Sequence, residues 1–279
     1  MKYNSLRNKP LEGTGSAKAT LSTLARKAVG GIVTIDEAAP LLGVSRRAAS
    51  LRLAALARRG WLKRVHRGFY YVLPLESGAE EAVVAPDPWV LAFRLYSPCY
   101  IGGWSAAEHW GQTEQLFRST FVVTNANIRK RSVRTLGTEF HLVRVRTERP
   151  TGIVSVWHGA VRVPTSDRER TIADALIDPG WLGGVRHLVD VLLAYVAERK
   201  TDFPKILEHL ERAGRASAIK RLGFLAETLL PEESVLIISA HARRSTGVIR
   251  LDPSVKDKGR LSKRWGLWIN VSLPHPNDS

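Results

Sequence analysis

The chain has 279 residues, of which 44% are hydrophobic and 24% are charged, values that are ordinary for a globular protein. Its strongly apolar run over residues 188–197 is interrupted by Asp190 and is too short to cross a bilayer, and its polar N-terminus lacks the apolar core of a secretory signal. The single cysteine, Cys99, excludes an intramolecular disulfide and a cysteine-based zinc site, so we expect a cytoplasmic protein that does not enter a membrane.

The net charge of +16 is distributed unevenly along the chain. Residues 1–75 hold 14 Lys and Arg against 3 Asp and Glu, residues 76–240 hold 20 of each, and residues 241–279 hold 8 against 3. Charge that served only solubility would be scattered. Its concentration at both ends predicts surfaces that face a polyanion, and a basic domain is typical of nucleic-acid binders.

The first quarter of the chain predicts a mobile arm over residues 1–15 and a domain over residues 16–75. An apolar pattern in this domain indicates a first helix that stops at Gly30-Gly31. Thr34 stands three residues before Glu37, which is the spacing of a capping box and predicts the start of a second helix.

A third helix and a hairpin complete this domain. Ser45 is a good N-cap, and residues 61–65 and 69–73 are rich in strand-forming residues on either side of a short turn. Helical spacing marks the buried face of the third helix: Ala49, Leu53, Leu56 and Ala57. Three helices followed by a basic hairpin predict a winged helix-turn-helix.

In a helix-turn-helix, the second helix of the motif enters the major groove with its N-terminal residues at the base edges. We therefore expect base contacts from Arg46, Arg47 and Ser50. Lys63, Arg64 and Arg67 would lie on the wing and contact phosphates or a minor groove. Other basic residues of the domain are expected to position it on phosphates: Arg26, Lys27, Arg58 and Arg59. A merely solvated basic helix, or a winged helix that binds protein, is the alternative interpretation.

Residues 76–88 are rich in Ala, Glu and Pro and predict a linker to a second domain over residues 89–279. This domain is predicted to mix helices and strands, and it includes a basic segment at 241–265. Ser105 and Ser166, each three residues before a glutamate, are predicted N-caps. The expected helices cover 89–95, 105–111, 171–176, 185–198 and 203–213 and a segment from 216, and the expected strands 121–124, 140–145, 154–156, 161–163, 235–239, 246–251 and 266–271. The whole chain is therefore predicted to be α+β.

Several stretches occur in a familiar order along the chain: RRGWLKRVHRGFYYVLP (58–74), IGGWSAAEHWGQTEQ (101–115), PTSDRERTIADAL (164–176), GWLGG (180–184) and LDPSVKDKGRLSKRWGLWINV (251–271). Together they resemble the AbiEi-type antitoxins of type IV toxin–antitoxin systems. The resemblance extends over most of the chain, from about residue 17 to residue 273. Gln112 departs from the pattern, because we expect an apolar residue there, and it puts the local helix packing in question.

The resemblance implies two activities. One is repression of the protein's own operon, by binding inverted repeats in operator DNA, which also suggests two copies on the DNA. The other is neutralisation of a cognate nucleotidyltransferase-like toxin by the second domain. It also implies DNA contact at the basic positions of the winged helix, which adds Arg52 to the residues above. On resemblance alone, candidate toxin contacts are Asp167, Arg168, Glu169 and Arg170.

We find no motif for catalysis, for a metal or for a cofactor. The chain contains no HExxH zinc motif, no GxxxxGK[ST] phosphate loop and no GxGxxG fingerprint. His109, beside Trp110 in an apolar helix, is expected to be a packed core residue. Glu198-Arg199-Lys200, with Asp190 upstream, has the residue types of a nuclease site, but it ends a helical segment, where cations favour the helix dipole.

We therefore expect a non-enzymatic protein without cofactor or metal. Two other functions stay open. One is a ligand-responsive winged-helix transcription factor without a toxin partner, in which residues 89–240 bind an effector. The other is a metal-dependent nuclease, in which Glu198 would be required for cleavage.

Overall fold

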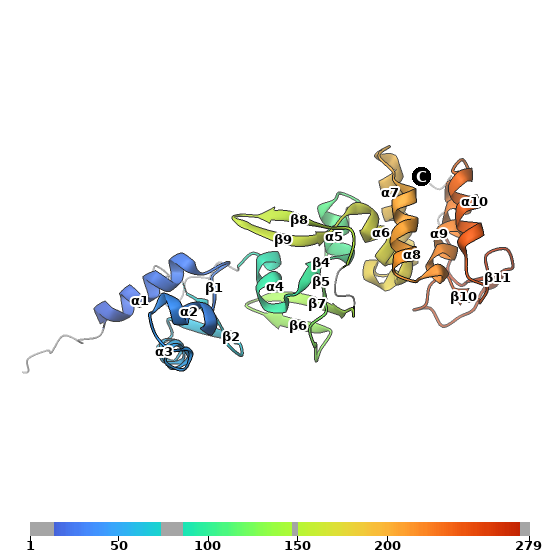
Figure 1. Cartoon of the computed structure of the whole chain (residues 1–279). Helices are drawn as coiled ribbons and strands as arrows, with labels where there is room; N and C mark the ends of the chain where they lie inside the picture. The colour runs from blue at the N-terminus through green and yellow to red at the C-terminus, as the bar shows by residue number, and fades with distance from the viewer. Residues whose placement is uncertain (1–13, 74–85, 147–149, 274–279) are drawn as a thin grey trace, which may run out of the picture. The chain divides into compact units, whose positions relative to one another are not determined.

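A computed structural model describes residues 14–73, 86–146 and 150–273 (Figure 1). The predicted arm over residues 1–15 and the predicted linker over residues 76–88 fall largely outside these residues. None of the helices in the described part of the chain combines the length and the apolar character that a membrane crossing requires.

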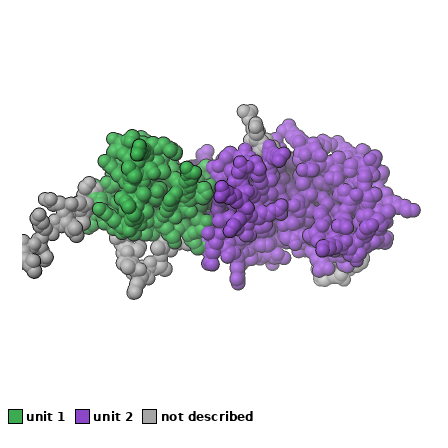
Figure 2. Space-filling model, turned by 90° about the horizontal axis from the view of Figure 1, so that it is seen from below, with its two compact units in different colours: residues 1–95, 135–137 green, residues 96–134, 138–279 purple. Residues whose placement is uncertain are grey.

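The chain forms two compact units, which Figure 2 shows in different colours. The first comprises residues 1–95 and 135–137, and the second comprises residues 96–134 and 138–279. Each unit has its own cluster of buried apolar side chains. The fold is α+β, as predicted, with a winged helix-turn-helix followed by a larger mixed α/β part.

The described part of the first unit holds helices and a three-stranded antiparallel sheet of order β1-β3-β2. Its elements are α1 (Thr14–Lys27), β1 (Ile32–Thr34), α2 (Ile35–Leu41), α3 (Arg46–Arg58), β2 (Leu62–His66), β3 (Phe69–Val72) and α4 (Pro88–Tyr96, whose last residue belongs to the second unit). Leu21, Leu24 and Leu53 are fully buried between α1, α3 and the sheet. The order of α1–α3, β2 and β3 matches the sequence-based prediction.

Local hydrogen bonds fix the starts of α2 and α3. Thr34 Oγ1 accepts from the Glu37 N–H at 3.1 Å, and the Glu37 carboxylate accepts from the Thr34 N–H at 2.9 Å, which confirms the predicted capping box. Ser45 Oγ accepts from the Ala48 N–H at 3.3 Å and caps α3, as predicted. Between the helices Gly43 has φ of +60°, a conformation that glycine adopts without strain.

The second unit is built on a six-stranded mixed sheet of order β6-β7-β5-β4-β9-β8. Its strands are β4 (Cys99–Ile101), β5 (Ser119–Thr124), β6 (Ser132–Thr135), β7 (Thr138–Arg144), β8 (Ile153–His158) and β9 (Val161–Ser166). β5 pairs parallel with β7, and β4 pairs parallel with β9 and antiparallel with β5. The strands at 121–124, 140–145, 154–156 and 161–163 were predicted, whereas β4 and β6 were not.

Helices follow the sheet in the chain, and α7 to α10 gather beside one another in Figure 1. The remaining elements of the second unit are α5 (Gly103–His109), α6 (Arg168–Ile177), the 3-10 helix η1 (Pro179–Leu182), α7 (Val185–Ala197), α8 (Phe203–Arg212), α9 (Ala216–Leu229), α10 (Ser234–Arg243), β10 (Ile249–Arg250), β11 (Arg260–Ser262) and β12 (Leu267–Ile269). Leu188, Leu192, Tyr195, Ile206 and Leu222 are fully buried in this helical part of the core.

One predicted strand, at 235–239, is wrong. This segment is the start of α10, in which Leu236, Ile237 and Ala240 are buried while Val235 and Ile238 are exposed. Burial at positions 236, 237 and 240 has the period of a helix. The run of apolar residues alone was too short to distinguish a helix from a strand.

Two predicted N-caps are also wrong. α5 begins at Gly103, and the Ser105 hydroxyl instead accepts from the Phe121 N–H at 2.9 Å. α6 is capped by Asp167, whose carboxylate accepts from the Arg170 N–H at 2.7 Å. In both cases packing against other elements decides what the serine hydroxyl bonds to. Ser166, like Ser105, is buried, and its hydroxyl contacts a strand and a helix instead of capping α6.

Candidate nucleic-acid interface

Helix α3 has a buried face and an outward face. Ala49, Leu53 and Leu56 are buried, as predicted. Since each residue turns the helix by about 100°, the side chains opposite these three are those at positions 47, 51 and 58. We call them the outward face of α3: Arg47, Leu51 and Arg58, all of which are exposed.

The predicted base-contacting residues lie together at the start of α3. Arg46, Arg47, Ser50 and Leu51 line one shallow hollow in the surface. Arg46 forms an ion pair with Asp36 of α2 at 2.6 Å, with both side chains about 70% exposed (71% and 70%). Arg47 forms no ion pair within the described residues, so its guanidinium is available to an outside partner.

The side chains of the other predicted DNA contacts, on α3 and on the wing, point in different directions. Arg52 is exposed on a flank of α3, between the buried face and the outward face. Lys63 and Arg64 are adjacent in β2 and exposed, and neighbouring strand residues point to opposite faces of a sheet. The two therefore cannot both face one DNA groove from one side of the hairpin. Arg67 is exposed in the turn of the wing.

The predicted phosphate contacts occupy the ends of two helices. Arg26 and Lys27 are exposed in the last turn of α1. Arg58 and Arg59 are exposed at the end of α3, and Arg58 belongs to the outward face. The structure thus puts Arg58 in line with Arg47, a relation that the sequence analysis missed.

Leu51 is a residue of this face that the sequence analysis did not single out. Its side chain is 66% exposed, although it is apolar and stands in the middle of a basic helix. The signal was present in the sequence, because Leu51 falls four residues after Arg47 and off the apolar face that holds Leu53.

A carboxylate joins α2 to α4. Glu37, the residue of the capping box, also accepts hydrogen bonds from Arg94 Nη2 at 2.6 and 2.7 Å. Partial burial acts to raise the pKa of Glu37, but the hydrogen bonds from Arg94 and Thr34 outweigh it, and the pKa lies below the ordinary value of 4.5. The helix that follows the wing is thereby tied to the helix-turn-helix.

The candidate toxin contacts are engaged inside the second unit. Lys205 Nζ lies 2.9 Å from both Asp167 and Glu169, and Glu169 also accepts from the Tyr195 hydroxyl at 3.0 Å. Arg170 pairs with Asp174 at 2.8 Å. Arg168 pairs with Glu198. A role in toxin contact stays a prediction. In the structure Asp167, Arg168 and Glu169 join the start of α6 to α7 and α8, and the ion pair of Arg170 lies within α6.

The basic C-terminal segment is partly neutralised by the protein itself. Arg243 pairs with Glu211 at 2.9 Å and Arg264 with Glu227 at 2.6 Å. Lys256 and Lys263 are exposed and form no ion pair with a described carboxylate.

Two residues weighed for catalysis have different surroundings. His109 is exposed in the last turn of α5, with its ring edge against Trp110 at 4.6 Å between centroids, so the prediction of a core position is wrong. Trp110 instead makes the inward contact, donating from Nε1 to the Ser166 carbonyl at 2.8 Å. Glu198 is the C-cap residue of α7 and is paired with Arg168, which gives it a structural partner.

The order of the elements, the capped turn and the basic outward face of α3 define a winged helix-turn-helix, the class of module that presents its second motif helix to the major groove. Residues 19–72 match the profile of the family described as transcriptional regulator, AbiEi antitoxin. This match confirms the predicted resemblance in the N-terminal region. It supports a DNA-binding antitoxin in general.

The whole fold resembles a solved structure. The crystal structure of the RV2827C protein from Mycobacterium tuberculosis superposes with a TM-score of 0.58 over 90% of both chains, at 19% sequence identity. At this identity the likeness is one of fold. No curated protein sequence matches the chain.

Proposed function

We propose that this protein is the antitoxin of a type IV toxin–antitoxin system. The first unit binds inverted repeats in double-stranded operator DNA and represses the protein's own operon. The second unit neutralises a cognate nucleotidyltransferase-like toxin, in the cytoplasm and without catalysis. The observation that carries the DNA-binding part is the exposed outward face of α3, with Arg47 unpaired among the described residues.

The experiment compares Arg47→Ala with Lys63→Ala in gel shifts on operator and random duplexes. Loss of a base-reading arginine removes about 1–3 kcal/mol of discrimination, so Arg47→Ala should bind operator and random DNA with more similar affinity. Loss of a phosphate contact should weaken both by the same factor and reduce the salt slope by about one. An Arg47→Ala protein that kept its operator preference would contradict the assignment of α3.

Toxin neutralisation is tested by co-expression with the product of the adjacent gene, scored for growth rescue and co-purification. The Arg47→Ala protein should rescue growth as well as the unaltered chain does, because the second unit is intact. Failure of rescue would reject the division of labour between the units. Absence of a nucleotidyltransferase-like neighbour would instead favour the ligand-responsive transcription factor.

A further inference from the structure

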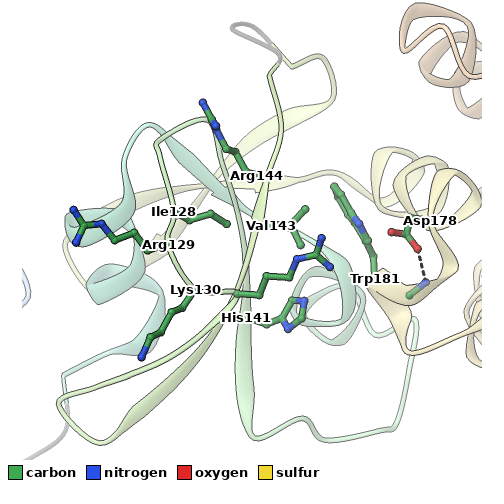
Figure 3. A pocket seen from close by; sticks show the side chains of 10 residues that line it. Ile128, Arg129, Lys130, His141, Val143, Arg144, Asp178 and Trp181 are labelled. Atoms are coloured by element: carbon green, nitrogen blue, oxygen red, sulfur yellow. Dashed lines mark hydrogen bonds between the residues drawn. The ribbon is translucent and has the colours of Figure 1, made fainter. Parts of the chain in front are cut away.

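The second unit contains a pocket of about 600 Å³ that no proposed activity uses. Three segments form it: the loop between β5 and β6, strand β7, and the 3-10 helix η1 (Figure 3). Its volume lies within the range of about 300–1,000 Å³ that is common for small-molecule sites. We call it the basic pocket.

The basic pocket concentrates positive charge within a region that is neutral on average. Residues 125–146 hold six Lys and Arg and one Glu, a net charge of +5, although residues 76–240 as a whole are neutral. Four of these cations line the pocket: Arg129, Lys130, Arg131 and Arg144. All four are exposed, and none forms an ion pair with a carboxylate in the described part of the chain.

The one carboxylate in the lining has another role. Asp178 accepts a hydrogen bond from the Gly180 N–H at 3.0 Å and so caps η1. Its position at the far end of the pocket in Figure 3 leaves the β7 side basic. The positive potential on that side is therefore available to an anion from outside.

The inner side of the pocket is apolar and aromatic. Figure 3 shows the side chains of His141, Val143 and Trp181 near one another, whereas Arg129, Lys130 and Arg144 extend outward around them. The His141 ring stacks on Phe121 with 5.1 Å between centroids. Burial lowers the pKa of His141, and the charge of Arg131 lowers it further, which favours the neutral form of this ring.

We propose that the basic pocket binds a small phosphorylated ligand with a planar ring, the chemical class of the nucleotides. Guanidinium groups bind phosphate oxygens through paired, charge-assisted hydrogen bonds, which suits Arg131 and Arg144. The neutral floor of His141, Val143 and Trp181 suits the flat, weakly polar surface of a base. A polyanion bound through its charges alone would not need this apolar floor. The proposed site also does not depend on DNA binding by the first unit.

The test titrates the full-length protein into fluorescently labelled ATP and GTP at an ionic strength of about 0.15 M, where charges more than about 8 Å apart are largely screened. Unlabelled nucleotides, the free nucleosides and inorganic triphosphate serve as competitors. The variant is Arg131→Gln combined with Arg144→Gln. The matched control is Arg186→Gln, which removes an exposed arginine of α7 outside the pocket.

The double variant should bind the labelled nucleotide at least about tenfold more weakly, the loss expected from removing charge-assisted hydrogen bonds, and the control should bind normally. A nucleotide should compete better than either its nucleoside or inorganic triphosphate, because the site holds both parts. Equal binding by the double variant and the control would overturn the proposal. So would inorganic triphosphate that competes as well as a nucleotide, or a single-stranded oligonucleotide that competes better. The melting temperatures of the double variant and of the control should equal that of the unaltered protein, which checks that the exposed substitutions leave the fold intact.

Discussion

The exposed leucine on α3 has a specific chemical counterpart in DNA. Leu51 lies between Arg47 and Arg58 on the outward face, and 66% of its side chain is exposed. Among the groups that base pairs present in the major groove, the thymine 5-methyl is the apolar one. We therefore expect Leu51 to contact a thymine methyl in the operator.

Deoxyuridine lacks that methyl group and tests the contact directly. The operator is first selected from random duplexes. Replacing one particular thymine in it by deoxyuridine should weaken binding of the unaltered protein several-fold. The expected loss of binding free energy is about 1 kcal/mol, the cost of moving a methyl group from an apolar contact to water. The same replacement should have no effect on Leu51→Ala. If every deoxyuridine affects both proteins equally, Leu51 does not read thymine, while DNA binding itself would still stand.

Gln112 bears out the sequence-based concern about local packing. Its side chain is fully buried, and neither its amide nitrogen nor its amide oxygen has a hydrogen-bond partner among the described residues. A buried polar group without a partner costs about 1–3 kcal/mol. We expect Gln112→Leu to raise the free energy of unfolding of the second unit by about 1 kcal/mol, measured by chemical denaturation.

The matched control is Gln115→Leu, which makes the same change at an exposed position three residues on. This substitution should leave stability within about 0.5 kcal/mol of the original value. A Gln112→Leu protein no more stable than the control would show that the amide is satisfied in solution.

At the level of elements, Glu37 is expected to stabilise two helices at once. Glu37→Gln should lower the stability of the first unit by about 1 kcal/mol, because it weakens both the capping box and the bond to Arg94. Asp36→Asn removes a neighbouring carboxylate whose ion pair is exposed, and it should cost less. Equal losses would contradict the special role of Glu37.

The effect of Glu37 also depends on pH. Its pKa is lower in the folded protein than its ordinary value of 4.5, so its contribution is fully present above that value. The contribution is lost as the pH falls through the lower, folded pKa. Denaturation curves of the unaltered protein and Glu37→Gln should therefore differ most near neutral pH and converge in acid.

Helix starts and helices differ in how far their local sequence determines their structure. The capping box at Thr34 and the Ser45 cap were predictable, because each hydroxyl bonds to a backbone group within its own helix start. Ser105 has the same spacing, but its hydroxyl bonds to Phe121 on a distant strand, and no local pattern reports this. Helix α10 was mistaken for a strand because its burial period extends beyond the short apolar run.

The basic pocket could not be predicted for a related reason. Averaging charge over residues 76–240 concealed the cations of residues 125–146, whose acidic counterparts lie elsewhere in the chain. Trp181 reaches the same pocket only through the packing of η1, far along the sequence from Arg131. The outward face of α3, in contrast, lies within one helix, and its periodicity could be followed in the sequence.

At the level of the whole molecule, the two units have separate apolar cores, so unfolding need not be a single cooperative event. We expect two transitions in calorimetry. Operator DNA should raise the one that belongs to the first unit, by mass action on its folded state, and leave the other unchanged. Trp61 and Trp89 lie in the first unit and the other six tryptophans in the second, which helps to assign the transitions by fluorescence. A single transition shifted by DNA would contradict this independence.

The ion pair between Arg46 and Asp36 has a consequence for how strongly the protein holds its DNA. A guanidinium that already has a carboxylate partner must leave it before it can bind a phosphate, and the freed carboxylate then stands close to the polyanion. The number of counterions displaced on binding will therefore be smaller than the number of cations on this surface. The proposed complex with operator DNA should therefore dissociate more readily than the charge of this surface alone would indicate, and Asp36→Asn should strengthen DNA binding.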